Sequence, residues 1–265
     1  MRRAAAVVRL TPAERHAVGL EAAWLKEVGG HRLLPPVGRA FRRLADDART
    51  AGFELRIASA HRSFDRQLHI WNAKLAGRRP VLDDQDRPVD LRRLSVREQI
   101  ECVLRFSALP GASRHHWGTD MDVFDAAAVP ADYRLRLDGA EVADDGVFGP
   151  LHRWLDERIA RGDSQGFFRP YDRDRGGVAP ERWHLSFAPL ARRFSSLLSC
   201  DLLRRAWDGQ HLSGAKANEP ASIAPEPVMH RDQLDACLET LFERFVRRVA
   251  EPPPTALGYA PDGEG

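Results

Sequence analysis

Residues 113–122 read SRHHWGTDMD, and residues 181–184 read ERWH. Together these two stretches offer imidazoles, carboxylates and a glutamate close to a histidine. A hydrolytic zinc site needs three protein ligands, an open position for water, and a base that accepts the proton of that water. The two stretches therefore predict a metal centre with hydrolytic chemistry, formed by segments that lie far apart in the chain.

The second stretch leads into an alternating pattern typical of a β-strand. Successive side chains of a strand point to opposite faces. This places Trp183, Leu185 and Phe187 toward a core, and His184 and Ser186 on the other face. We therefore expect His184 to be available as a ligand.

The first stretch alternates in the same way from residue 119 onward. Asp120 and Asp122 share one face, while Met121 and Val123 share the other. Two neighbouring carboxylates repel each other unless a cation compensates them, and a bound Zn²⁺ would be such a cation. The alternation leaves open which aspartate is the ligand, and a solvated acidic strand is the alternative interpretation.

His115 and His116 are consecutive and point in different directions, so at most one of them is expected to bind a metal. The other would orient a ligand or contact the substrate. Gly118 permits a positive φ or a close backbone approach just before the strand.

Glu181 lies three residues before His184, which on a regular strand would put the two side chains on opposite faces. We expect Glu181 to lie outside the strand and to turn toward the metal, where it would act as a general base. A surface glutamate at a strand end is the alternative.

With these residues the chain resembles the zinc D-alanyl-D-alanine carboxypeptidases and dipeptidases of the VanY type, which share a metal-site fold with lysostaphin-type endopeptidases and the hedgehog signalling domain. The family pattern, S-x-H-x(2)-G-x(3)-D followed by E-x-W-H, is matched at every position. The resemblance implies that His115, Asp122 and His184 bind Zn²⁺ and that Glu181 is the catalytic base.

A third element of that family has the form S-x-Y-R-S followed by a glutamine, and this chain has SAHRS over residues 59–63 and then Gln67. The resemblance implies that Arg62 stabilises the oxyanion or holds a substrate carboxylate, a task suited to a planar guanidinium. It implies that Gln67 helps to bind the peptide. His61 stands where the family has tyrosine, which puts any role of the tyrosine ring in doubt.

Three further residues complete the expected substrate-binding set: Ser113, Trp183 and His116. His116 departs from the family pattern, which has no fixed histidine there. Trp183 and Trp117 are expected either to wall the cleft or to pack in the core. The resemblance spans roughly residues 51–187.

Composition excludes several classes of protein. The formal net charge is +2 and 43% of residues are hydrophobic, so the chain can form a sizeable core but lacks the basic excess of a nucleic-acid-binding protein. The three cysteines form no CxxC pair. Arg9 ends the N-terminal apolar run before it reaches the length of a secretory signal, and no stretch is long enough to span a membrane. We expect a cytoplasmic location, or the cell envelope if the start is misassigned.

The pattern of elements lacks regular βαβ alternation and favours an α+β fold, with a small antiparallel sheet carrying the zinc site and helices flanking it. Helices are expected over about 11–29, 37–50, 63–75, 95–106, 149–159 and 231–249, and a strand over 53–58. We expect a peptidase domain at 1–205 that includes the N-terminal helices, a linker at 206–227, and a C-terminal helix with a disordered tail at 228–265. The apolar stripe of that helix would pack on the domain or pair with another subunit, which leaves the oligomeric state open.

The leading functional hypothesis is a zinc metallopeptidase that hydrolyses peptidoglycan stem peptides as a D-alanyl-D-alanine carboxypeptidase. An L,D-carboxypeptidase or a lysin-like endopeptidase is a close alternative. A non-catalytic zinc-containing binding domain is the alternative of another class, and Glu181 argues against it because structural zinc needs no base.

Overall fold

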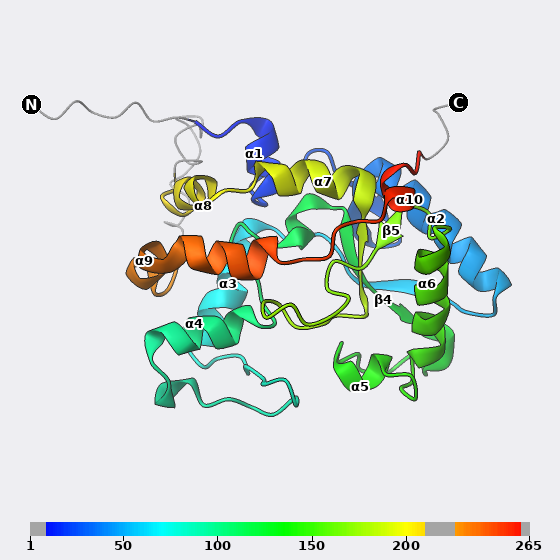
Figure 1. Cartoon of the computed structure of the whole chain (residues 1–265), viewed down its shortest axis with the longest axis horizontal. Helices are drawn as coiled ribbons and strands as arrows, with labels where there is room; N and C mark the ends of the chain where they lie inside the picture. The colour runs from blue at the N-terminus through cyan, green and yellow to red at the C-terminus, as the bar shows by residue number, and fades with distance from the viewer. Residues whose placement is uncertain (1–8, 210–225, 261–265) are drawn as a thin grey trace, which may run out of the picture.

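The computed structural model describes residues 9–209 and 226–260. These residues form an α+β fold in which helices surround a four-stranded antiparallel sheet, as predicted (Figure 1). The strand order is β3-β4-β6-β5. The strands are β3 (Leu55–Ser59), β4 (Asp120–Asp125), β6 (His184–Phe187) and β5 (Phe167–Phe168).

The register of β4 against β6 fixes which side chains face each other. Met121 lies opposite Leu185, and Asp122 lies opposite His184. Met121 and Leu185 are fully buried in the hydrophobic core, so the alternation predicted for both strands is confirmed. Directly opposite residues have Cβ atoms about 5 Å apart, which places Asp122 and His184 in contact on the other face.

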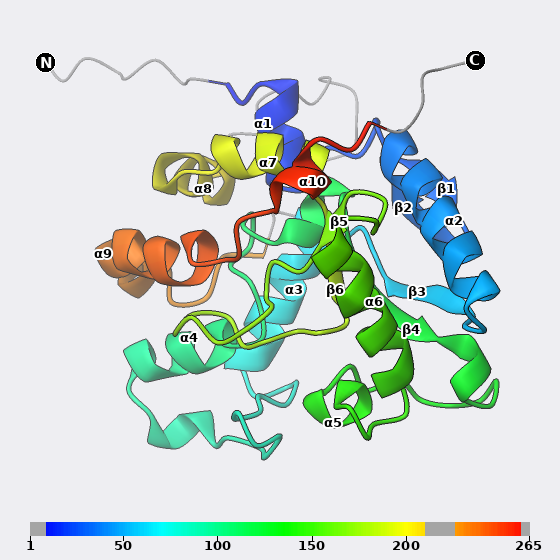
Figure 2. The same ribbon diagram turned by 45° about the vertical axis from the view of Figure 1, so that its right-hand side comes forward.

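The predicted helix starts at residues 11, 63 and 95 are confirmed, because Thr11, Ser63 and Ser95 each accept a hydrogen bond from a backbone N–H of the first turn. Figure 2 shows α6 in front of the sheet and α2 beyond its β3 edge. The helices are α1 (Pro12–Ala17), α2 (Pro35–Thr50), α3 (Phe64–Leu75), α4 (Val96–Leu104), α5 (Gly139–Val142), α6 (Gly149–Arg161), α7 (Ala188–Leu197), α8 (Cys200–Trp207), α9 (Arg231–Phe242) and α10 (Pro254–Leu257).

The helix predicted over residues 11–29 is wrong beyond its first turns. α1 ends at Ala17, and an antiparallel hairpin of β1 (Lys26–Val28) and β2 (His31–Leu33) follows. Gly29 and Gly30 have φ angles of 57° and 80° and form the two-residue turn of that hairpin. Two consecutive residues with positive φ give a turn whose twist matches paired strands, so the Gly-Gly pair joins strands instead of ending a helix.

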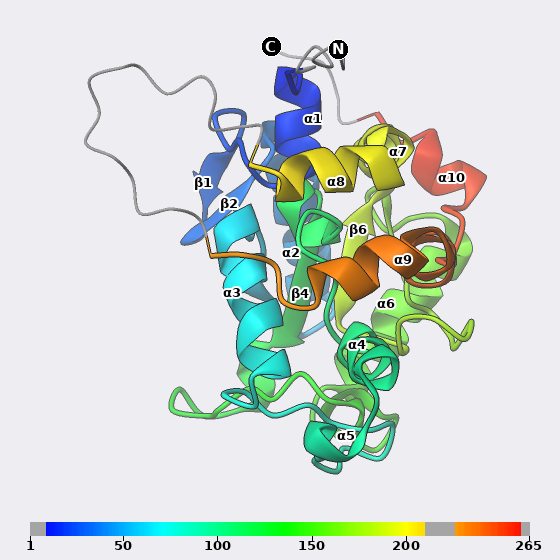
Figure 3. The ribbon, with the colours of Figure 1, turned by 90° about the vertical axis from the view of Figure 1, so that its left-hand side faces the viewer.

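The C-terminal helix packs on its own domain. Leu234, Leu238 and Leu241 of α9 are fully buried in the same core as the sheet, and α9 packs against α8 (Figure 3). The tail predicted to be disordered from Pro252 contains α10, whose Ala256 is buried against Phe168. Residues 210–225 of the predicted linker and 261–265 of the tail lie outside the described residues. No helix in the described ranges has the length and hydrophobicity that crossing a membrane requires.

Gly118 is the turn residue that places the first stretch against β4. Its φ is 67°, and an added Cβ would lie 2.3 Å from Cδ2 of Leu25. We expect Gly118→Ala to lower the free energy of unfolding by at least about 2 kcal/mol, since a strained φ and an overpacked contact each cost about 1–3 kcal/mol. Gly30→Ala is the matched control, because Gly30 has a φ of 80° but open space around it. Equal losses for the two variants in denaturant titrations would show that the close contact at Gly118 has no effect.

Candidate metal centre

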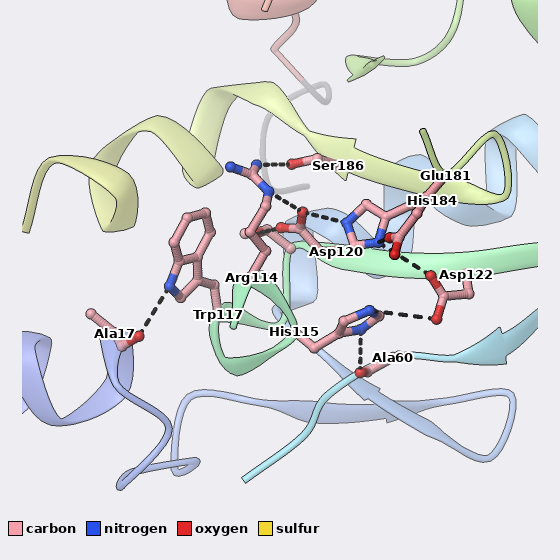
Figure 4. A network of polar contacts seen from close by, with 11 residues as sticks. Ala17, Ala60, Arg114, His115, Trp117, Asp120, Asp122, Glu181, His184 and Ser186 are labelled. Atoms are coloured by element: carbon pink, nitrogen blue, oxygen red, sulfur yellow. Dashed lines mark hydrogen bonds and ion pairs between the residues drawn. The ribbon is translucent and has the colours of Figure 1, made fainter. Parts of the chain in front are cut away.

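The structure brings together the three residues predicted to bind metal. His115, Asp122 and His184 each offer a ligand atom, and these atoms all lie within 4.8 Å of one another. Nε2 of His115 is 3.4 Å from Oδ2 of Asp122, and Nδ1 of His184 is 3.2 Å from Oδ1 of the same residue (Figure 4). All three side chains are buried.

The sheet and the turn before it create this convergence. Asp122 and His184 are opposite each other on β4 and β6. His115 lies on a 3₁₀ turn, Arg114–Trp117, which enters β4 through Gly118. The backbone N–H of Arg62 donates to the carbonyl oxygen of His115 over 3.0 Å, which fastens this turn to the segment that follows β3.

Hydrogen bonds decide which ring nitrogen of each histidine is free. Nδ1 of His115 lies 2.8 Å from the carbonyl oxygen of Ala60, so this nitrogen must carry the proton and Nε2 is left as a ligand. Nε2 of His184 lies 3.0 Å from Oδ1 of Asp120, so it donates to that carboxylate and leaves Nδ1 facing Asp122. The two free nitrogens and the Asp122 carboxylate form a donor set that suits a catalytic zinc ion with an open fourth position.

Asp120 is held by other partners and orients His184 instead of completing the donor set. Nε of the buried Arg114 donates to its Oδ1 over 2.7 Å, and the Thr119 hydroxyl donates to its Oδ2 over 2.5 Å. Arg114 also donates to the Ser186 hydroxyl over 2.6 Å. Arg114 therefore supplies the cation for Asp120, whereas the ion-pair partners of Asp122 among the described residues are the two histidines.

Both aspartates are held in the charged form. Although burial opposes ionisation, Arg114 and His184 lower the pKa of Asp120, and His115 and His184 lower the pKa of Asp122. Burial disfavours the imidazolium of His184, but its hydrogen bonds to the two aspartates raise its pKa to about 9. Because a metal ion binds the neutral imidazole, metal and proton compete for His184.

Glu181 lies outside the strand and beside the donor set, as expected. The N–H of His184 donates to the carbonyl oxygen of Glu181, which closes a turn just before β6. Oε2 of Glu181 lies 3.7 Å from Nδ1 of His184. Burial, together with the charge of Asp122, raises the pKa of Glu181 to about 7, against the opposing effects of His184 and Arg62. A carboxyl with a pKa near neutrality can both accept and return a proton.

Arg182, a partly buried arginine that bonds to α6, restrains the turn that carries Glu181. Nε of Arg182 donates to Oδ2 of Asp156 over 2.9 Å, and its Nη1 donates to the carbonyl oxygen of Val142 over 2.7 Å. Asp156 also accepts from Arg169. Because Arg182 lies between Glu181 and Trp183 in the chain, these hydrogen bonds restrain the backbone of the segment that carries Glu181 and His184.

A cavity of about 220 Å³ opens over the donor set. Nη1 of Arg62 donates to Oε1 of Gln67 over 2.8 Å, which holds the guanidinium at the cavity wall. Burial lowers the pKa of Arg62, while Asp122 and Glu181 oppose this shift. The predicted site residues that line the cavity are Arg62, Ser113, His115, Asp122, Glu181, Trp183 and His184.

Gln67 and His116 are not among the residues that line this cavity, and both contact Arg62 instead. Both are fully buried. Nε2 of Gln67 donates to the carbonyl oxygen of Ala108 over 2.7 Å while its oxygen accepts from Arg62. Nδ1 of His116 donates to the carbonyl oxygen of Arg62 over 2.6 Å, and its Nε2 accepts from the N–H of Gly111. Both side chains hold Arg62 in place.

Tyr171 and Trp117 are two further aromatic residues at the cavity, and they differ in role. Tyr171, which no sequence pattern singled out, lines the cavity with its ring centroid 5.1 Å from that of His184. Its carbonyl oxygen accepts from the N–H of Glu181. Trp117 is almost entirely buried, donates from Nε1 to Ala17, and lies under the guanidinium of Arg114, so core packing is its main role.

Comparison with known proteins places these features in a family. A protein of Haemophilus influenzae described as uncharacterized is 36% identical over 109 residues, which cover 40% of this chain and 81% of that protein. Among solved structures, VanYB in complex with D-alanine-D-alanine is 21% identical, with a TM-score of 0.45 over 69% of this chain and 87% of that one. A VanY D,D-pentapeptidase variant from a VanB-type resistance cassette, in complex with Zn(II), is also 21% identical, with a TM-score of 0.44 over 70% and 92% of the two chains.

The family model described as VanY, D-alanyl-D-alanine carboxypeptidase, matches residues 30–190, well over half of the chain. This range contains every residue of the donor set, together with Glu181 and Arg62. The chain belongs to the VanY family of D-alanyl-D-alanine carboxypeptidases.

Proposed function

We propose that the protein is a zinc-dependent D,D-carboxypeptidase that removes the terminal D-alanine from peptidoglycan stem peptides. The observation that carries this proposal is the placement of Glu181 beside three metal-ligand side chains on the wall of one cavity. Membership of the VanY family supports the substrate class.

Each charged residue of the cavity has a chemical task in this reaction. Bound at the three donor atoms, Zn²⁺ would polarise the scissile carbonyl and make a neighbouring water molecule more acidic. Glu181 accepts a proton from the attacking water and passes it to the leaving amine.

Arg62 supplies a permanent positive charge near the reacting carbonyl or the terminal carboxylate of the peptide. Gln67 holds its guanidinium and His116 holds its backbone, so this charge is fixed before substrate arrives. Ser113 and Trp183 contribute the polar and apolar walls against which the terminal residues lie.

Digestion of defined stem peptides tests this proposal. The purified protein with added Zn²⁺ is incubated with a pentapeptide ending in D-Ala-D-Ala and with the corresponding tetrapeptide, and products are identified by mass. We expect the pentapeptide to lose a single D-alanine and the tetrapeptide to persist. Conversion of the tetrapeptide to tripeptide would indicate an L,D-carboxypeptidase, and internal cleavage an endopeptidase. If the zinc-loaded protein left both peptides uncleaved, the result would indicate a non-catalytic domain.

A further inference from the structure

A second cavity of about 460 Å³ adjoins the metal centre. Phe106, Leu137 and Trp183 line both cavities, so the second cavity lies directly beside the one over the donor set. Its other walls come from the end of α3, the loop that follows α3, the residue after α4, the segment before α5 and residues 174–180. Figures 1 and 2 both show this loop beside α5.

Most charges on the walls of this second cavity neutralise one another. Arg105 pairs with Asp84 and with Asp174, each at 2.7 Å. Arg136 pairs with Asp138 at 3.1 Å. Each of these five residues has an ion-pair partner, although Asp84 and Asp174 share one guanidinium and so leave one excess negative charge.

Lys74 and Asp86 are different, because each lines the cavity with an uncompensated charge. Within the described residues, neither side chain makes a hydrogen bond or an ion pair. Lys74 is half-buried, and a half-buried ammonium without a carboxylate partner loses hydration without compensation. Burial, with the nearby charges of Arg79 and Arg62, lowers the pKa of Lys74 to about 8 against the opposing effect of Glu181. The cation therefore lies within electrostatic reach of the catalytic residues.

We propose that this second cavity binds a stem-peptide side chain that ends in both a carboxylate and an ammonium group, with Lys74 binding the carboxylate and Asp86 the ammonium. The inference rests on the proposed function and specifies its substrate class. The branching residue of a stem peptide is a diamino acid, whose side chain ends either in an amine alone or in an amine and a carboxylate on one carbon. An amine alone would leave Lys74 unpaired and would be repelled by it, whereas the amino-carboxylate terminus satisfies both charges.

Two pentapeptides that differ only at the branching residue, lysine or diaminopimelate, test the inference. We expect kcat/KM for the diaminopimelate peptide to exceed that for the lysine peptide by about tenfold or more, as a charge-assisted hydrogen bond in a partly buried site provides. Lys74→Met should reduce this ratio to about 1. Asp86→Asn should lower kcat/KM for both peptides and leave the ratio in place, because both carry the ammonium.

Matched controls separate these effects from a general loss of charge. Lys26 is exposed on β1, so Lys26→Met should keep the parental ratio. Asp145 is exposed before α6, so Asp145→Asn should keep kcat/KM for both peptides. Thermal melts of Lys74→Met verify that the variant is folded.

Equilibrium binding makes the test independent of catalysis. The zinc-loaded Glu181→Gln protein is titrated with both peptides, with and without Lys74→Met. We expect about tenfold tighter binding of the diaminopimelate peptide, which Lys74→Met abolishes. Equal binding of both peptides, or a preference that survives Lys74→Met, would overturn the inference even if D-alanine is released. Failure of the parent to release D-alanine, with the binding preference intact, would instead refute the proposed function alone.

Discussion

Glu181→Gln should lower kcat/KM for D-alanine release by about 10²–10⁴-fold, the usual contribution of a general base, while metal content stays unchanged. The carboxamide keeps the size of the side chain but cannot accept a proton. Glu181 is not one of the three grouped donor residues, so its loss leaves them intact. Steady-state kinetics together with elemental analysis of the dialysed protein measure both quantities.

The control for this variant is Glu157→Gln on α6. The Glu157 side chain is 67% exposed, and its ion-pair partner, Arg161, is also exposed. It should keep the parental rate. A Glu181→Gln protein that hydrolysed the pentapeptide as fast as the parent would exclude Glu181 as the base.

The same residue should set the pH dependence. The base must be ionised, so kcat/KM should fall tenfold per pH unit below the pKa of Glu181. That pKa is raised to about 7 in the metal-free protein, and a bound cation will lower it. The raised pKa also affects stability, because the folded protein holds the Glu181 proton more tightly than the unfolded chain does. This contribution to the free energy of unfolding is present at low pH and is lost as pH rises through about 7. Glu181→Gln should therefore stabilise the metal-free protein above pH 7 and have little effect near pH 4.

Asp122→Ala should abolish tight zinc binding, whereas Asp120→Asn should weaken it by about 10–100-fold, the usual effect of changing a residue that orients a ligand. Asp122 places an oxygen near the free nitrogen of each histidine. Asp120 instead accepts from Nε2 of His184 and is paired with Arg114. Competition with a chromophoric chelator gives both dissociation constants.

The effects of the two variants on the stability of the metal-free protein should have the opposite order, with the larger loss for Asp120→Asn. Asp120→Asn leaves the buried guanidinium of Arg114 without its carboxylate, and loss of one partner of a buried ion pair costs about 3–5 kcal/mol. Asp122→Ala removes a carboxylate that has no arginine partner, so the metal-free protein should lose less. If Asp120→Asn instead eliminated zinc binding and Asp122→Ala preserved it, the assignment of the two carboxylates would be reversed.

The parts of the site that could be predicted are those set by strand periodicity. Alternation alone placed Asp122 and His184 off the core faces of their strands, and the register then set them opposite each other. It could not choose between Asp120 and Asp122, because both share a face. That choice depends on Arg114, six residues before Asp120, and no helix or strand period relates two positions across a 3₁₀ turn and a glycine with positive φ.

Other features depended on tertiary contacts that leave no local pattern. The Gly29-Gly30 pair is compatible with a helix stop or a hairpin turn, and only the pairing of residues 26–28 with 31–33 distinguishes them. Tyr171 lies in an irregular loop without periodicity, so its position against His184 had no local signal. The buried positions of Gln67 and His116 follow from the packing around Arg62 and could not be separated from substrate contact by residue type alone.

Anomalous diffraction at the zinc edge, from crystals of the purified zinc-loaded protein, tests the metal centre most directly. We predict a single strong peak bonded to Nε2 of His115, a carboxylate oxygen of Asp122 and Nδ1 of His184, at the roughly 2.0–2.2 Å of zinc–nitrogen and zinc–oxygen bonds, with the Glu181 carboxylate nearby but unbonded. A peak held by other residues, or no peak at this position in zinc-loaded crystals, would contradict the account.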